Sequence, residues 1–404
     1  MTLLRMALRS LRQRLLASIL TACSIALGVA LVGAVLLLER EAEGAFRRTA
    51  VGVEILVGGN KGSRIDTLLS ALYYVGRAPG RIAWDYYEEL EADPRVEYAI
   101  PLAVGDTYRG FPIVGIGEEF FTRFHPRPGV PLVLQGSIPA GMSRFAVVGA
   151  EAARRTGLGL GDTFYPAHGG AEGHPLHEDE IFTVAAVALP TGTAHDRAIW
   201  IDIRQFLRLK GHRGLDRAEE VDAVSAILLK TKSKSPLVIE PLIKEINDGT
   251  EAQAIRPVQV VAELFDVVGD VRKILKWVGY LVIAVAVVNV SVSLYNAMAS
   301  RRRETAILRA LGARKRTIIA GVLLESAILC GVGALLGLAL AHGGAAAAAP
   351  FVERRGGIRL EEFGLHPLEP VILLVLVGVG CLTGMLPAFR AYRVDVARGL
   401  APVD

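Results

Sequence analysis

Four long apolar runs divide the chain into membrane-like and water-like segments. Each run has about 20 residues or more, the length at which a helix crosses the hydrocarbon core of a bilayer. The first run is also longer than the roughly 7 to 15 apolar residues of a cleaved signal peptide, so we expect it to be retained. The pattern predicts transmembrane helices at residues 15–38, 277–298, 317–341 and 368–389.

Residues 1–14 show a different pattern, with apolar side chains at helical spacing among arginines. Leu4, Leu8 and Leu11 fall near one face of a helix, and four arginines surround them. This arrangement predicts an amphipathic N-terminal helix on the cytoplasmic surface of the membrane.

The distribution of Lys and Arg predicts the orientation of the spans. Short basic segments beside spans mark the cytoplasmic side. Segments 1–14, 299–316 and 390–404 are all basic, and the middle one has seven Lys and Arg against a single acid. With four spans, all three fall on the same side. We therefore expect both termini in the cytoplasm of a bacterial inner membrane, with 39–276 and a short loop at 342–367 in the periplasm.

The exported segment 39–276 alternates strand-like and helix-like runs with Gly and Pro between them. The expected fold class is a membrane protein with four transmembrane α-helices and a large α+β periplasmic domain inserted between helices 1 and 2. Residues 39–46 and 258–276 are expected to extend the first two spans outward as stalks. Strands are predicted at 53–57, 111–116, 145–148, 181–188, 198–203 and 223–229, and helices at 84–92, 150–156, 203–209 and 239–247.

Composition agrees with a chain divided between lipid and water. Of its 404 residues, 52% are hydrophobic and 21% are charged, and the mean hydropathy is +0.40. So apolar a chain is unusual for a soluble domain, and so charged a chain is unusual for an embedded one. The net charge of +4 and the lack of any nucleic-acid-binding signature argue against a nucleic-acid partner. Cys23, Cys330 and Cys381 each lie in an apolar run, which predicts neither disulfides nor a cysteine metal site.

The sequence lacks the motifs of catalysis and of nucleotide binding. There is no Gly-x-Ser-x-Gly, no His-Glu-x-x-His and no Gly-x-x-x-x-Gly-Lys-Ser/Thr phosphate loop. The acidic pair Glu88 and Glu89 fits a solvated helix face. A tethered hydrolase is therefore the weakest hypothesis, and we expect no cofactor in this chain, with ATP and Mg bound by a separate ATPase.

The basic segment 299–316 is the candidate contact for that ATPase. An apolar face at helical spacing is predicted on a short helix that Gly312 would end. The alternative is a basic loop that only fixes the orientation of the spans. The residues assigned to coupling are Arg302, Arg303, Glu304, Ile307, Arg309, Leu311 and Gly312.

Polar and small residues inside the spans are candidates for helix packing. Asn289, Ser293 and Asn296 form a polar stripe suited to hydrogen bonds between helices. Glu325 is an ionisable group within a span, which either pairs with an Arg of the coupling segment or N-terminal helix, or snorkels to the interface. Gly333 and Gly337 have the small-xxx-small spacing that permits close helix approach.

A histidine-rich loop between two predicted strands raises the question of metal binding. His168, His174 and His177 lie within thirteen residues that also contain four acids. His and carboxylate groups bind zinc, but this spacing is not that of a closed structural site, and loops are commonly hydrophilic. Zinc binding here is a minor hypothesis, and with it a role in envelope metal homeostasis.

Four stretches together resemble the MacB/FtsX-type permeases of ABC transporters, the type VII or mechanotransmission family. Arg303-Glu-Thr-Ala-Ile-Leu-Arg-Ala-Leu-Gly-Ala313 resembles the family's cytoplasmic helix. Leu324-Glu-Ser-Ala327, with the glycines after it, is similar to its third span. The periplasmic domain is matched by Phe145-Ala-Val-Val-Gly149 and the strands that follow, and the C-terminal exit by Leu386-Pro-Ala-Phe-Arg390.

The resemblance implies a homodimer, or a heterodimer, of four-span permeases that bind a cytoplasmic ABC ATPase subunit. ATPase closure would be transmitted to the periplasmic domain to export or extract an envelope substrate, with membrane lipid and a periplasmic adaptor or substrate protein as further partners. The alternative is a membrane regulator that activates a periplasmic enzyme such as a cell-wall hydrolase. The sequence departs from the family at Val396, where Pro is usual.

Overall fold

The computed structural model describes residues 3–139, 143–168, 180–209, 223–300, 315–356, 364 and 367–392. The chain divides into two compact units. The helical unit comprises Met1–Arg40, Val268–Ala348 and Glu362–Asp404, and the strand-rich unit comprises Glu41–Val267 and Ala349–Glu361.

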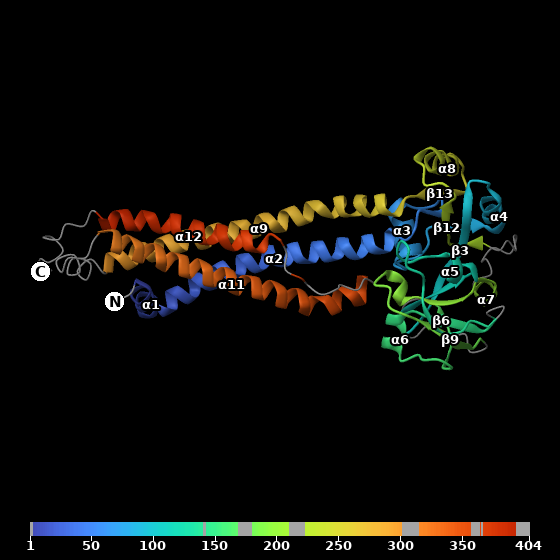
Figure 1. Ribbon diagram of the computed structural model, residues 1–404, viewed down its shortest axis with the longest axis horizontal. Helices are drawn as coiled ribbons and strands as arrows, with labels where there is room; N and C mark the ends of the chain where they lie inside the picture. The colour runs from blue at the N-terminus through green and yellow to red at the C-terminus, as the bar shows by residue number, and fades with distance from the viewer. Residues whose placement is uncertain are drawn as a thin grey trace, which may run out of the picture. The chain divides into compact units, whose positions relative to one another are not determined.

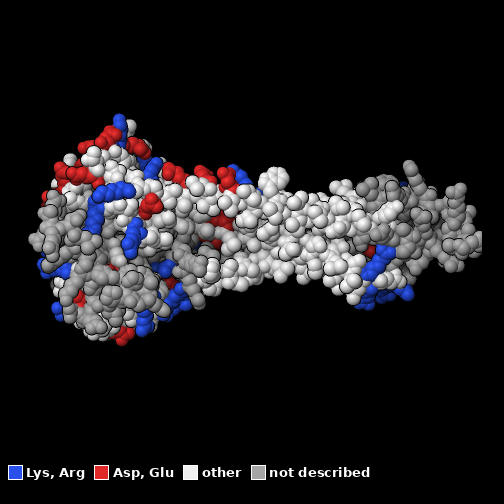
Figure 2. Space-filling view, turned by 180° about the vertical axis from the view of Figure 1, so that it is seen from behind, with Lys and Arg blue, Asp and Glu red and all other residues white. Residues whose placement is uncertain are grey.

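Long helices that run alongside one another build the helical unit (Figure 1). Within the described residues, three of its helices, α2, α9 and α11, are long and apolar enough to cross a membrane, and a shorter apolar helix covers Glu369–Met385. On the face shown in Figure 2, the middle of this unit carries neither Lys and Arg nor Asp and Glu. The helices are α1 (Leu3–Gln13), α2 (Leu15–Ala50), α9 (Pro257–Ser300), α11 (Lys315–Gly356) and α12 (Glu369–Tyr392).

Two of these helices extend well beyond the apolar runs from which they were predicted. α2 continues without a break to Ala50, and α9 begins at Pro257, so the predicted stalk segments 39–46 and 258–276 are helical. Since backbone hydrogen bonding in a helix is local, charged residues can continue it once the apolar turns have formed.

The segment 342–367 requires a correction. The sequence predicts a loop there, but α11 continues to Gly356, so residues 342–356 are helical. Five successive alanines at 345–349 follow the apolar run, and alanine has the highest helix propensity of any residue. The length of the apolar run therefore predicted too early an end for this helix.

The strand-rich unit is built on an 11-stranded sheet in the order β13-β1-β12-β3-β4-β10-β6-β9-β5, with β7 on β9 and β8 on β3. Most pairs are antiparallel, and the parallel ones are β4 with β10 and β6 with β9. The strands are β1 (Ile55–Gly59), β3 (Val96–Tyr108), β4 (Phe111–Ile116), β5 (Leu134–Gly136), β6 (Phe145–Val148), β7 (Thr163–Phe164), β8 (Ala167–His168), β9 (Phe182–Ala188), β10 (Ile199–Asp202), β12 (Ala226–Thr231) and β13 (Ala252–Ile255).

Both faces of this sheet are covered by apolar side chains. Successive residues of a strand point to opposite faces, and in β1 Ile55 and Val57 join one buried cluster while Leu56 joins the other. The remaining elements are a two-stranded pair, β2 (Ile82–Ala83) with β11 (Ala223–Val224), the 3-10 turn Ala194–Arg197, and the helices α3 (Arg64–Leu72), α4 (Trp84–Ala92), α5 (Glu119–Arg123), α6 (Ala150–Thr156), α7 (Ile203–Arg208) and α8 (Pro236–Asp248).

Helix α3 begins with a reciprocal cap. The Ser63 hydroxyl accepts a hydrogen bond from the Asp66 amide at 3.1 Å, and the Asp66 carboxylate accepts one from the Ser63 amide at 3.1 Å. The hydrogen bonds from Ser63 lower the pKa of Asp66. The cap fixes the start of a helix whose Leu68 and Leu72 are fully buried.

Replacing Ser63 by Ala is expected to destabilise the strand-rich unit by about 1 kcal/mol, because amide groups at the start of α3 lose their acceptor. Urea unfolding followed by fluorescence would measure the loss. Ser63→Asp, which keeps a capping oxygen, should retain most of the stability, and equal losses in the two variants would contradict the role assigned to the cap.

Candidate functional sites in the two units

Several residues predicted as functional lie outside the described residues. These are the whole coupling set, namely Arg302, Arg303, Glu304, Ile307, Arg309, Leu311 and Gly312, together with His174 and His177 of the histidine loop. His168 ends β8, where its backbone pairs with that of Asp106 in β3. Within the part of the chain that the structure describes, no group of three His, Cys, Asp or Glu residues is placed to hold a metal ion.

Helices α2 and α9 are joined in the helical unit by a carboxylate between two cations. Glu39 of α2 forms an ion pair with Arg272, and its other oxygen lies 2.9 Å from the Lys276 ammonium. The three side chains are 22–27% exposed, so water screens these charges less than it does on an open surface. The sequence analysis did not identify this cluster. Its only local signal is that Arg272 and Lys276 share a helix face at i, i+4.

Glycines let α2 and α9 approach closely. A methyl group at Gly28 of α2 would lie 2.8 Å from the Ile283 side chain, and one at Gly279 of α9 would overlap Val32. In both cases the added methyl would lie closer to its neighbour than a van der Waals contact allows. The two helices are therefore held by an ion-pair cluster and by direct backbone approach in the same unit.

The predicted small-xxx-small pair lies against α2. A methyl group on Gly333 would lie 2.8 Å from Ile25 Cβ, and one on Gly337 would lie 2.6 Å from Val29 Cβ. These contacts place α11 on the side of α2 that includes Ile25 and Val29, both of which are buried. Close packing of this kind replaces the hydrophobic effect as the source of helix association in lipid.

Glu325 of α11 is half-buried and bonds to the N-terminal helix. The Ser10 hydroxyl donates to Glu325 Oε2 at 2.7 Å, and Ser10 itself is buried. This hydrogen bond comes from the N-terminal helix, one of the two segments from which a partner was expected, and pairing of Glu325 with an arginine stays a prediction. Figure 2 shows Lys and Arg gathered at the end of the unit where α1 lies. Glu325 therefore ties the basic surface helix to a span.

The polar stripe of α9 is described only in part. Asn289 is exposed, and the side chains of Ser293 and Asn296 lie outside the described residues. A further polar contact joins α11 to α12, where His342 Nε2 lies 2.9 Å from the Glu369 carboxylate. Glu369 is 6% exposed.

A buried histidine lies in the core of the strand-rich unit. His195 is 1% exposed, and its Nδ1 lies 2.8 Å from the Tyr74 hydroxyl. The rings of Phe120 and Phe124 pack edge-on against it. Burial lowers the pKa of His195 to about 4, because a cation in this apolar site would lose its hydration. The structure places His195 in the core, where the neutral side chain is favoured.

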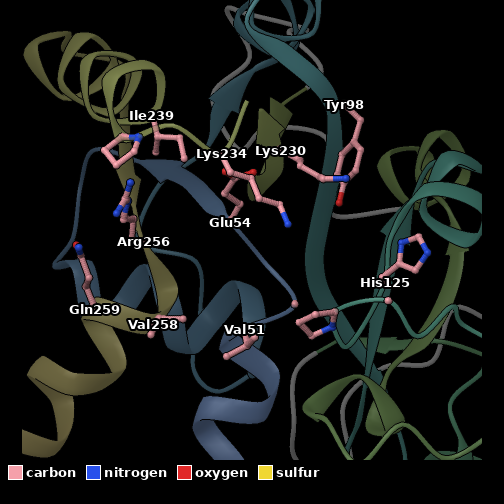
Figure 3. Close-up of a pocket in the computed structure, with 14 residues that line it drawn as sticks. Val51, Glu54, Tyr98, His125, Lys230, Lys234, Ile239, Arg256, Val258 and Gln259 are labelled. Atoms are coloured by element: carbon pink, nitrogen blue, oxygen red, sulfur yellow. The ribbon is translucent and has the colours of Figure 1, made fainter. Parts of the chain in front are cut away.

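The strand-rich unit also has an open pocket of about 770 Å³. It is lined by residues that follow α2, by the starts of α8 and α9, and by β12. Figure 3 shows Glu54, Lys230 and Lys234 close together, with His125 apart from them. Glu54 accepts hydrogen bonds from the amide and hydroxyl of Thr231, at 3.1 and 3.0 Å, and Lys230 pairs with Glu97 at 3.0 Å.

Most charged side chains of the pocket are already paired with other residues of the chain. Arg256 at its rim also has a partner, Glu240 at 3.0 Å. Lys234 is exposed and has no partner among the described residues. The Glu54 carboxylate already accepts two hydrogen bonds from Thr231. The pocket therefore offers a surface for binding, with apolar walls at Val51 and Val258 and a cation at Lys234.

Comparison with known proteins covers both units. Residues 18–245 match the model of the MacB-like periplasmic core domain, and residues 277–396 match that of the FtsX-like permease C-terminal region. No curated protein matches the sequence.

Two solved structures are similar to part of the chain. The periplasmic region of MacB from Actinobacillus actinomycetemcomitans is 13% identical with a TM-score of 0.36, and the match covers 53% of this chain and 94% of that one. The extracellular domain of the noncanonic ABC-type transporter YknZ from Gram-positive bacteria is 14% identical with a TM-score of 0.31, and the match covers 50% and 98%.

The two family models follow one another along the chain in the order expected from the sequence, first the domain between the apolar runs and then the C-terminal spans. The periplasmic core model alone spans more than half of the 404 residues. The chain is a membrane protein with an extracellular MacB-like domain, and it belongs to the MacB/FtsX-type family of ABC transporter permeases.

Proposed function

We propose that this chain is the membrane-spanning subunit of an ATP-driven transporter of the bacterial inner membrane, with four spans, cytoplasmic termini and a periplasmic strand-rich unit. A separate cytoplasmic ATPase binds ATP and magnesium and contacts the basic segment 299–316. ATPase closure moves this segment, and the motion passes along α9 and α2 to the strand-rich unit, which exports or extracts an envelope substrate.

The α2–α9 pair supports this mechanism most directly. Each helix continues from its apolar run into residues of the strand-rich unit without a break. In the helical unit the Glu39 cluster and the close glycine contacts hold the two helices together. A helix transmits displacement along its axis because its hydrogen bonds run parallel to that axis. A pair of helices joined in this way suits force transmission better than two independent ones.

Reversing the charge of Glu304 tests the proposal. Glu304 is the only acid in the basic segment, and Glu304→Lys is expected to leave the chain folded but to weaken its coupling to the ATPase. The measurement is the nucleotide hydrolysis of the ATPase with and without the permease in vesicles, together with co-purification of the two subunits. Glu89→Lys, an exposed site on α4, is the control and should stimulate hydrolysis like the wild type.

Normal co-purification, hydrolysis and transport in the Glu304→Lys variant would refute the assignment of this segment. A deletion strain separates the two functions that the family allows. Loss of export of an envelope compound supports a transporter. A change in cell-wall turnover without any change in export supports a regulator of a periplasmic enzyme.

A further inference from the structure

The pocket of the strand-rich unit has two unlike walls. Figure 3 shows Val51 and Val258 on one side of it and Glu54, Lys230 and Lys234 on the other. Val51 directly follows α2, and Val258 lies in the first turn of α9. The two valines are 43% and 38% exposed. An apolar wall opposite a charged wall fits a ligand that has an apolar part and a charged part.

The cations that line the pocket outnumber its acids. Among the described residues of the lining, Glu54 is the only carboxylate, and there are three cations, namely Lys230, Lys234 and Arg256. Glu54 accepts its two hydrogen bonds from Thr231, which carries no charge, and Lys234 has no ion pair among the described residues. The charge that complements this lining is negative.

The ion pairs of the other two cations leave this preference in place. Glu97 and Glu240, the partners of Lys230 and Arg256, do not line the pocket. Each carboxylate is more exposed than its cation, at 46% against 33% and at 56% against 27%. Water therefore screens the carboxylates more strongly, and ion pairs as exposed as these are weak. An anion inside the pocket would meet the cations from the less hydrated side.

The walls are held by contacts that need no ligand. The turn at residues 127–130 forms one side and is closed by a hydrogen bond from the Val130 amide to the Arg127 carbonyl at 3.0 Å. Gly129 in this turn has a φ of 74°, a conformation that favours glycine. Gly52 packs so closely that an added methyl would lie 2.5 Å from the Pro126 carbonyl oxygen. The pocket is therefore preformed, and its volume of about 770 Å³ is that of a small-molecule site.

We propose that this pocket binds an anionic amphiphile, a molecule with one alkyl chain and a carboxylate or a similar anionic head. The head lies beside Lys234, where a charge-assisted hydrogen bond orients it. The alkyl chain lies against Val51 and Val258 and is removed from water there. A ligand in this position contacts the exit from α2 and the start of α9 together. Its binding is therefore coupled to the relative position of these two helix ends.

The test measures the binding of radiolabelled decanoate to the full-length chain in nanodiscs of zwitterionic lipid, with the binding to empty nanodiscs subtracted. Three unlabelled competitors separate the parts of the ligand. Decanol and decyltrimethylammonium have the same alkyl chain with a neutral or a cationic head, and acetate has the anionic head without the chain. Decanoate should bind at least about tenfold more tightly than each competitor, because only decanoate has both parts.

Two matched pairs of variants locate the site. Lys234→Gln should raise the Kd for decanoate about tenfold. Lys232→Gln, which changes an exposed lysine whose ammonium donates to the Pro94 carbonyl, should leave the Kd unchanged. Val51→Glu places a like charge on the apolar wall and should abolish binding. Val133→Glu, at a site 49% exposed and outside the lining, should bind like the wild type.

Four outcomes would overturn the proposal: no saturable binding of decanoate beyond that of empty nanodiscs, equal affinity for decanoate and any competitor, equal effects in variants and controls, or displacement of decanoate by tetraglutamate as effectively as by unlabelled decanoate. The competitors are compared on the wild-type chain, so the test stays decisive if a variant fails to fold. The inference goes beyond the proposed function, because binding needs neither the ATPase nor transport. Its failure would leave the permease function standing.

Discussion

Acidification from pH 7 to pH 4 is expected to lower the free energy of unfolding of the strand-rich unit by about 3 kcal/mol through His195 alone. The folded pKa of about 4 is below the 6.5 of an exposed histidine. Between pH 6.5 and 4, His195 therefore binds a proton in the unfolded chain but not in the folded one. The full stability is present above pH 6.5 and is lost progressively as the pH falls toward 4.

Urea unfolding of the detergent-solubilised chain at successive pH values would measure this dependence. Trp200 is fully buried and its ring lies 5.6 Å from that of Phe120, which also packs on His195. With Trp84 and Trp277 replaced by Phe, Trp200 reports on this core.

A pair of glutamine variants isolates the contribution of His195. His195→Gln keeps a polar partner for Tyr74 but cannot titrate, so it should lose most of the slope between pH 6.5 and 4. His125→Gln removes an exposed histidine and should keep the wild-type slope. A wild-type slope in His195→Gln would show that other groups cause the pH dependence.

Gly337→Ala is expected to destabilise the helical unit by about 1–3 kcal/mol, the usual cost of forcing a side chain into a packed site. The added methyl would lie 2.6 Å from Val29 Cβ and 2.7 Å from the Ala26 carbonyl oxygen. The backbone of α2 cannot rotate away as a side chain can, so α2 and α11 must separate. Thermal unfolding in detergent and the yield of monodisperse protein are the measurements.

The same helix provides a matched control for this change. A methyl on Gly321 of α11 would meet nothing within 4 Å. Gly321→Ala should therefore match the wild type or exceed it, since alanine is the better helix former. If the two variants were equally stable, the close approach of α11 to α2 would not contribute to packing.

Much of the secondary structure could be predicted because its signals are local. The predicted strands at 111–116 and 145–148 and the predicted helices at 84–92 and 150–156 are confirmed at the same boundaries. The long strand β3, Val96–Tyr108, was missed. Pro101 and Gly105 interrupt its pattern, and proline is normally confined to edge strands. Pairing with β12 and β4 on its two sides stabilises it regardless.

The candidate sites were predictable to different degrees. Gly333 and Gly337 could be singled out because their spacing is a property of one helix, although the partner helix could not be named. The Glu39 cluster joins residues 233 positions apart, and no pattern in either segment identifies the other. The environment of His195 depends in the same way on Tyr74 and Phe124, which come from distant segments.

The sequence by itself determined where the chain is apolar enough to enter a bilayer, which segments are basic, and that a mixed α+β domain lies between the first two apolar runs. These properties depend on residues close together in the chain, whose hydration and hydrogen bonding do not require a partner. Only the tertiary structure decided which helix faces meet, which charges are paired and which histidine is buried. Those outcomes depend on contacts between residues far apart in the chain. A side chain is buried, and a charge is paired or loses its hydration, only when such contacts form.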